Sequence, residues 1–95
     1  MGDKINLALI GAGNWGKNLA RVFHKLGVLR AICDSSEETL AKKAEEYPEI
    51  ITTTSCSEVL ASPDINTIAI AAPAEQHYFL AKKALLSDKH VFVEK

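Results

Sequence analysis

The chain has 95 residues, of which 47% are apolar and 24% charged, and its formal net charge is −1. This length predicts one domain, and the composition is that of a globular protein rather than a disordered one. The near-neutral charge disfavours nucleic acid and anionic membranes as partners, and no apolar run approaches the ~20 residues that a bilayer requires.

Cys33 and Cys56 have neither CxxC nor metal-ligand spacing, so we expect two structural thiols in a reducing compartment and no metal site. The N-terminus shows no basic segment followed by an apolar one, as a secretory signal would. These features together predict a soluble cytoplasmic protein.

The first elements read as a strand, a helix and a second strand. Residues 5–10 form an apolar run stopped by glycine, which predicts a strand buried on both faces. Gly27 is placed to end the helix that follows, and residues 29–33 predict the second strand. The apolar residues of this helix recur at helical spacing: Trp15, Leu19, Val22 and Leu26.

Two capping boxes follow. Ser35 with Glu38 predicts the start of a helix that ends before Pro48 and carries Leu40, Ala44 and Tyr47 on one face. Residues 50–53 predict a short strand. Ser55 with Glu58 then repeats the capping-box spacing ahead of Val59 and Leu60, and residues 62–64 predict a loop.

The last third repeats the alternation. Residues 65–72 predict a strand halted by Pro73, and residues 90–94 predict a fifth strand. The helix between them is indicated by Leu80, Ala81, Ala84 and Leu85. Strands alternating with helices predict an α/β fold, a Rossmann-type doubly wound parallel sheet of about five strands in the order 3-2-1-4-5.

The segment Gly11-Ala12-Gly13-Asn14-Trp15-Gly16 matches GxGxxG at a strand-to-helix junction. There Gly11 permits the tight turn, Gly13 lets the backbone approach a pyrophosphate, and Gly16 lets the helix pack closely on the strand. The N–H groups and dipole at the helix start favour a diphosphate by about 1 kcal/mol. The alternative is a glycine-rich turn without a ligand.

Asp34 stands eighteen residues after Gly16, at the end of the second predicted strand. A carboxylate there can accept hydrogen bonds from an adenosine ribose and would repel a 2′-phosphate, so the sequence predicts NAD rather than NADP. The alternative role for Asp34 is the N-cap of the next helix, which Ser35 or Ser36 can equally fill.

Two further segments end strands on the same predicted edge: Ala72 to His77, and Glu94 with Lys95. Because ligands of open α/β sheets bind at the carboxyl ends of the strands, their convergence with the glycine turn and Asp34 supports a binding crevice. Taken singly, Pro73 could start a helix, His77 could be a surface or capping residue, and Lys95 a frayed terminus.

The glycine loop, Asp34, the P-x-x-x-H pattern at Pro73 and His77, and Glu94-Lys95 resemble the N-terminal domain of the glucose–fructose oxidoreductase and inositol dehydrogenase family. Gly13 to Leu19 is most similar to a subgroup that oxidises the 3-hydroxyl of UDP-linked N-acetylated sugars or sugar acids. Two features depart from the family pattern: Ala74 stands where many members have Asn, and the proline of the E-K-P signature does not follow Lys95.

The resemblance implies that the turn residues, including Ala12, Asn14 and Trp15, hold NAD. It also implies that Ala72, Pro73, His77 and Glu94 border the nicotinamide, and that Lys95 reaches the reacting hydroxyl as a catalytic residue. On this reading residues 1–95 are the dinucleotide-binding domain of an NAD-dependent sugar or nucleotide-sugar dehydrogenase, truncated before the substrate domain and inactive alone.

Two other functions share this pattern: a noncatalytic nucleotide-sensing module, and, less compatible with Pro73 to His77, a methyltransferase. Exposed apolar surface and an unpaired fifth strand also predict self-association, so a homo-oligomer is expected.

Overall fold

A parallel sheet of five strands organises the chain. The computed structural model describes residues 5–11, 16–71, 82–83, 85–87 and 89–93. The strands are β1 (Leu7–Ile10), β2 (Leu29–Cys33), β3 (Ile51–Thr53), β4 (Thr67–Ile70) and β5 (His90–Val93). Their spatial order is β3-β2-β1-β4-β5, and every neighbouring pair is parallel. The predicted doubly wound order is confirmed.

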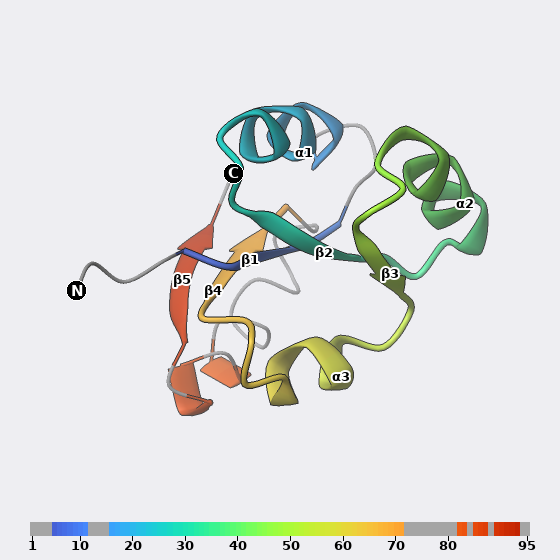
Figure 1. Ribbon diagram of the computed structural model, residues 1–95. Coiled ribbons are helices and arrows are strands. Elements are labelled where there is room, and N and C mark those ends of the chain that lie inside the picture. Colours follow the sequence, from blue (N-terminus) through green and yellow to red (C-terminus); the bar gives the residue numbers. More distant parts are fainter. Residues whose placement is uncertain (1–4, 12–15, 72–81, 84, 88, 94–95) are drawn as a thin grey trace.

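Helices cover both faces of this sheet (Figure 1). Helices α1 (Gly16–Lys25) and α2 (Glu37–Glu46) lie on one face, and α3 (Cys56–Ala61) lies on the other. Successive strand residues point to opposite faces and build two core clusters. The cluster under α1 and α2 contains Leu7, Leu9, Leu29, Ile32 and Ala69, and the cluster under α3 contains Ala8, Ile10, Ala31, Ile68 and Ile70.

The buried face of α1 differs from the expected one. Val22 and Leu26, predicted to face the core, are 45% and 67% exposed, and Trp15 lies outside the described residues. The face that packs on the sheet is formed by Gly16, Leu19, Ala20 and Phe23. The period of the pattern identifies the helix, but two apolar residues lie on a flank that the underlying sheet does not cover.

Helix α2 follows β2 and ends where the sequence predicts. Leu40 is buried and Tyr47, its C-cap residue, packs against the core, whereas Ala44 is exposed. The backbone N–H of Tyr47 donates to the carbonyl of Lys43 at 2.8 Å, which closes the helix before Pro48. A single buried leucine and a packed tyrosine therefore hold this helix to the sheet.

Helix α3 is capped by Ser55, whose side-chain oxygen accepts from the backbone N–H of Glu58 at 3.3 Å. The reciprocal half of the predicted capping box is not formed. The Glu58 carboxylate accepts from the Thr53 hydroxyl at 2.8 Å, and the Ser55 N–H donates to that same hydroxyl oxygen at 3.0 Å. The threonine hydroxyl thus bridges the two groups that a capping box would join directly.

Strand β4 is shorter than the apolar run that predicts it. Residues 65–72 yield β4 only over Thr67–Ile70, although Ile65 is buried, and residues 62–64 lie between α3 and β4 outside helix and strand, as predicted. Residues 82–83 and 85–86 are helical and Leu85 is 62% exposed; Leu80, Ala81, Ala84 and Glu94 lie outside the described residues.

The amino-terminal edge of the sheet, where the strands begin, is closed by polar side chains. Lys89 is 8% exposed, and its ammonium donates to the carbonyls of Ser62 at 2.8 Å and Ile65 at 2.6 Å. The amide oxygen of Asn66 accepts from the backbone N–H of Asn6 at 3.0 Å. Buried polar groups are thereby paired, as burial requires.

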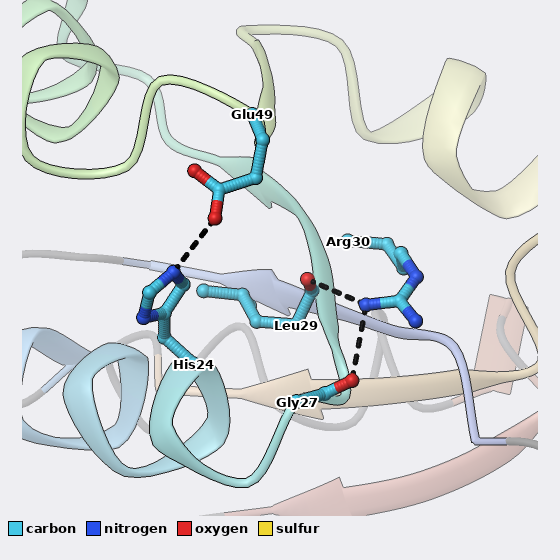
Figure 2. A network of polar contacts seen from close by, with 5 residues as sticks. All are labelled: His24, Gly27, Leu29, Arg30 and Glu49. Atoms are coloured by element: carbon cyan, nitrogen blue, oxygen red, sulfur yellow. Dashed lines mark hydrogen bonds and ion pairs between the residues drawn. The ribbon is translucent and has the colours of Figure 1, made fainter.

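A second polar network joins α1 to the segment before β3 (Figure 2). His24 Nε2 lies 3.0 Å from the Glu49 carboxylate. The hydrogen bond with His24 is the main cause of a lowered pKa of Glu49, with a bond to its own backbone adding to it. Beside it, the guanidinium of Arg30 donates to the carbonyls of Gly27 and Leu29, which anchors the turn between α1 and β2.

Candidate functional site

Hydrogen bonds continue one residue past the carboxyl ends of three strands. The N–H of Gly11 donates to the carbonyl of Cys33 at 2.7 Å, and the N–H of Asp34 donates to the carbonyl of Thr53 at 3.2 Å. The N–H of Ala71 donates to the carbonyl of Ile10 at 2.8 Å. Gly11, Asp34 and Ala71 therefore lie along one edge, which confirms the predicted convergence of the glycine turn with Asp34.

The two described glycines of the turn are required by geometry. Gly11 has a φ of 94°, a backbone conformation that side-chain-bearing residues rarely adopt. A Cβ placed on Gly16 would overlap the Gly11 carbonyl oxygen and lie 2.7 Å from its carbon. Both predicted roles, the tight turn and the close packing of helix on strand, agree with this geometry. Ala12, Gly13, Asn14 and Trp15 lie outside the described residues.

Helix α1 begins at this edge. Its first turn carries no acidic residue, and its last turn carries His24 and Lys25. The Lys25 ammonium near the carboxyl end complements the helix dipole, whereas the first N–H groups of an α-helix have no partner within the helix and carry positive partial charge. Because Gly16 packs against Gly11, that amino end is held beside the strand ends and is suited to an anion.

The Asp34 carboxylate is held in place by the backbone that follows it. One of its oxygens accepts from the Ser36 N–H at 2.8 Å, and the side chain is half-buried. The Ser36 hydroxyl in turn accepts from the Thr39 N–H at 3.2 Å and is the N-cap of α2. The predicted capping box of Ser35 and Glu38 is therefore wrong, and Asp34 is not the cap.

The edge also contains residues that the sequence did not single out. Ala71 lies 3.5 Å from the position that a Cβ on Gly16 would occupy, so its methyl group packs under the first turn of α1. The Thr53 carbonyl accepts from the Asp34 N–H, and the Thr53 hydroxyl donates to the Glu58 carboxylate. Because the carboxyl ends of parallel strands share one edge, the position of Thr53 at the end of the third predicted strand was the available signal.

Several predicted site residues have no described position: Ala72, Pro73, His77, Glu94 and Lys95 all lie outside the described residues. Among the residues that are described, no cluster of three or more His, Cys, Asp or Glu side chains could hold a metal ion. The same part of the chain has no helix of sufficient length and apolarity to cross a bilayer.

A groove of about 540 Å³ runs over β2, β3 and α3. Its floor is apolar and includes Ala31 and Val59, and charged side chains at its rim include Arg30, Glu49 and Asp64. Neither Gly11 nor Asp34 lines it. The groove therefore reaches this edge only at Thr53, which lines it, and does not include the glycine turn or the Asp34 carboxylate.

A doubly wound sheet with a close-packed glycine turn, a helix start and a carboxylate on the next strand defines a dinucleotide-binding domain of the Rossmann class. Residues 5–95 match the oxidoreductase family with an NAD-binding Rossmann fold, Gfo/Idh/MocA, and the chain belongs to this family. It is therefore an NAD-binding domain of an oxidoreductase family, as the sequence predicted.

Related sequences and structures agree on this assignment. The chain is 33% identical to the uncharacterized oxidoreductase YdgJ of Escherichia coli, over all of the chain and 28% of YdgJ. It is 31% identical to the uncharacterized oxidoreductase YrbE of Bacillus subtilis, with the same coverage. The chain thus spans a little over a quarter of the length of these relatives.

Three of the similar solved structures illustrate the agreement over almost the whole chain. GenD2 from gentamicin A biosynthesis, in complex with NAD, has a TM-score of 0.89 and 26% identity, and covers 100% of this chain with 28% of its own. Biliverdin reductase from Synechocystis, in complex with biliverdin and NADP+, has a TM-score of 0.88 and 25% identity, and the match covers 98% of this chain and 30% of the reductase. Levoglucosan dehydrogenase, in complex with NADH and L-sorbose, has a TM-score of 0.79 and 27% identity, and the match covers 96% of this chain and 27% of the dehydrogenase.

Proposed function

We propose that this chain is the NAD-binding domain of a dehydrogenase that transfers hydride between a hydroxyl-bearing carbon of a sugar or nucleotide sugar and NAD. The observation that supports it best is the placement of Asp34. Its carboxylate is oriented by the Ser36 N–H and lies on the strand next to the glycine turn. A diphosphate at the turn would bring an adenosine ribose toward that carboxylate.

The described residues fit such a cofactor. A Cβ at Gly16 would fill space that the backbone itself occupies, so the turn brings main chain rather than side chain to the edge. The N–H groups at the start of α1 would bind the diphosphate, and Asp34 would accept hydrogen bonds from the ribose hydroxyls. The bound nicotinamide would supply the hydride acceptor, while the protein orients it and shields the site from water.

The proposed preference for NAD over NADP follows from charge. A 2′-phosphate placed beside the Asp34 carboxylate would bring two anions together, whereas the ribose hydroxyls of NAD donate to it. Family membership alone does not decide this point, because the similar structures contain NAD in one case and NADP+ in another. The preference therefore depends on this one side chain.

Calorimetric titration of the chain with NAD and NADP tests the preference. A charge-assisted hydrogen bond contributes about 1.5 to 3 kcal/mol, so NAD should bind at least about tenfold more tightly than NADP. The Asp34→Asn variant should narrow that ratio several-fold. Asp64→Asn, an exposed carboxylate in the loop before β4, is the matched control and should leave the ratio unchanged. Tighter binding of NADP by the unaltered chain would contradict the proposal.

The sugar substrate is supported by two indications. The run from Gly13 to Leu19 resembles nucleotide-sugar 3-dehydrogenases, and one similar structure is a complex with NADH and L-sorbose. In this reaction Lys95 would polarise the reacting hydroxyl and help remove its proton. A lysine acts in this way only in a buried site that lowers its ordinary pKa of about 10.4.

The chain spans 28% of these relatives, so the catalytic proposal is tested in a polypeptide of the relatives' length. With a UDP-N-acetyl sugar as probe, the Lys95→Met variant should lose at least about a hundredfold in kcat while keeping its affinity for NAD. A protein that binds NAD but oxidises no sugar before any substitution would instead be the nucleotide-sensing module.

A further inference from the structure

One flank of α1 leaves apolar side chains in solvent. Val22 is 45% exposed and Leu26, just after the helix, is 67% exposed; Phe92 of β5 is 45% exposed. The ring of Phe92 meets that of Phe23 edge-on, with centroids 6.2 Å apart, which places β5 beside α1. We call Val22, Leu26 and Phe92 the apolar strip.

The helical geometry of α1 orients this flank. His24 points away from β5, because its ring stacks on Tyr47 of α2 at 4.5 Å and its Nε2 contacts Glu49 before β3. At 100° per residue, Val22 lies on the opposite side of the helix from His24, and Leu26 follows it one turn later. The apolar strip is therefore one surface over the α1 side of β5, as the arrangement in Figure 1 allows.

The handedness of the fold indicates what does not cover the strip. The connection from β3 to β4 crosses the sheet toward β5, and its helix α3 lies on the face away from α1 (Figure 1). Because parallel crossovers share one handedness, a helix joining β5 to a further strand on its free side would also lie on the α3 face. Such a connection would leave the strip uncovered.

Charge and area disfavour a second copy as the occupant. Helix α1 has the sequence GKNLARVFHK, with three permanent cations and one histidine and no carboxylate, so two copies meeting through it would repel. Three partly exposed side chains also supply only part of the ~800 Å² per partner that a standard stable interface buries. A surface of this size suits a tethered segment, because the tether raises the effective concentration of the segment and a smaller buried area is then sufficient for binding.

We propose that the apolar strip docks an amphipathic α-helix with carboxylates beside its apolar face, supplied by the further polypeptide that the longer family members possess. The apolar face would cover Leu26 and Phe92, and its carboxylates would meet Arg21 and Lys25 on the solvent side of α1. The length of the relatives, of which this chain spans 28%, leaves ample polypeptide to supply it. This inference rests on packing and charge, and it stands apart from the cofactor assignment.

The chemistry is tested with the 95-residue chain and two synthetic helical peptides of about 18 residues. Both carry leucines at i, i+3, i+4 and i+7, one with glutamates and one with lysines at the flanking positions. In ¹H–¹⁵N NMR titrations the glutamate peptide should shift Val22, Leu26 and Phe92, and the lysine peptide should bind at least about tenfold more weakly. Shifts confined to other surfaces, or equal binding of both peptides, would overturn the proposal.

A matched pair of variants locates the site. Leu26→Lys should weaken binding of the glutamate peptide at least about tenfold, the equivalent of one buried leucine. Ile51→Lys, an equally exposed apolar residue at the far edge of the sheet, should change it less than about twofold. Circular dichroism verifies that both variants fold, and equal losses in the two would refute the assigned surface.

The source is tested separately. Overlapping peptides that tile YdgJ beyond its matched segment are titrated into the chain, and one acidic amphipathic peptide among them should reproduce the Leu26-dependent shifts. Absence of any such peptide would overturn the tethered source. Sedimentation velocity supplies the remaining outcome: a dimer abolished by Leu26→Lys and retained in Ile51→Lys would show that a second copy occupies the strip and would reject the proposal.

Discussion

Replacing Gly16 by alanine should affect stability and cofactor binding at the glycine turn to different degrees. The added methyl group would overlap the Gly11 carbonyl oxygen and lie 2.7 Å from its carbon. Helix α1 and the turn would have to part by more than about 1 Å to restore ordinary contact. Overpacking of this kind costs about 1 to 3 kcal/mol.

The size of that cost predicts which property fails. A chain of this length has a free energy of unfolding of about 5 to 14 kcal/mol, so most molecules should still fold. The N–H groups at the start of α1 would be displaced from the strand ends, and hydrogen bonds weaken steeply with such displacement. We therefore expect Gly16→Ala to lower the affinity for NAD at least about tenfold while the chain remains folded.

Urea denaturation and calorimetric titration with NAD measure the two effects. Gly27→Ala is the control, since Gly27 has a φ of 78° but nothing within 4 Å of the position that an added methyl group would occupy. This control should lose about 1 to 2 kcal/mol from the left-handed backbone alone and keep its affinity for NAD. Unchanged NAD binding in Gly16→Ala, or a larger loss of affinity in Gly27→Ala, would refute the role assigned to the close contact.

Three further predictions concern hydrogen bonds elsewhere in the fold. Lys89→Met removes the ammonium donor from the buried Ile65 carbonyl and leaves the Ser62 carbonyl with only the Ile65 N–H. The substitution should lower the free energy of unfolding by about 2 kcal/mol in urea, and an unchanged midpoint would argue against the role of the ammonium. Ser36→Ala should cost about 1 kcal/mol, whereas Ser35→Ala should cost a few tenths, and the reverse order would restore the capping box that the sequence suggested. Because contact with His24 lowers the pKa of Glu49, the carboxylate stabilises the fold above its ordinary pKa, and this contribution disappears as the pH falls through the lowered value. Thermal melts of the chain and of Glu49→Gln should therefore differ near neutral pH and converge in acid, and a difference that grows in acid would contradict the assignment.

The strand order and the second strand followed directly from the sequence. Residues 29–33 form β2 with the predicted bounds, because an apolar run between a helix-ending glycine and an acidic turn has few other conformations. The alternation of strands and helices then restricts the topology, since parallel strands need crossovers of one hand. Local pattern and a global rule agreed, and the order 3-2-1-4-5 resulted.

Details that depend on neighbours in space were harder to predict. Periodicity places Val22 and Leu26 near the apolar face of α1, but how much of that face is covered depends on where the helix crosses the sheet. The choice between Ser35 and Ser36 as N-cap depends on the Asp34 carboxylate, which accepts from the Ser36 N–H. Neither relation is visible in residue spacing.

The site was predicted in part for the same reason. Gly11, Gly16 and Asp34 are identified by a motif whose spacing reflects their chemistry, and the structure brings them to one edge. Ala71 and Thr53 reach that edge through the pairing of β1 with β4 and of β2 with β3. Such register is a long-range property, and no short motif encodes it.

The residues that close the amino-terminal edge of the sheet contribute to stability and lie apart from the residues proposed to bind the ligand. Lys89 and Asn66 join loops at the end of the sheet opposite the glycine turn. Thermostabilising changes can therefore be introduced among these loops without touching the residues that meet a nucleotide. Sequence variation among relatives at the amino-terminal edge should change the thermal stability of the domain, whereas variation at the carboxyl edge should change its affinity for ligands.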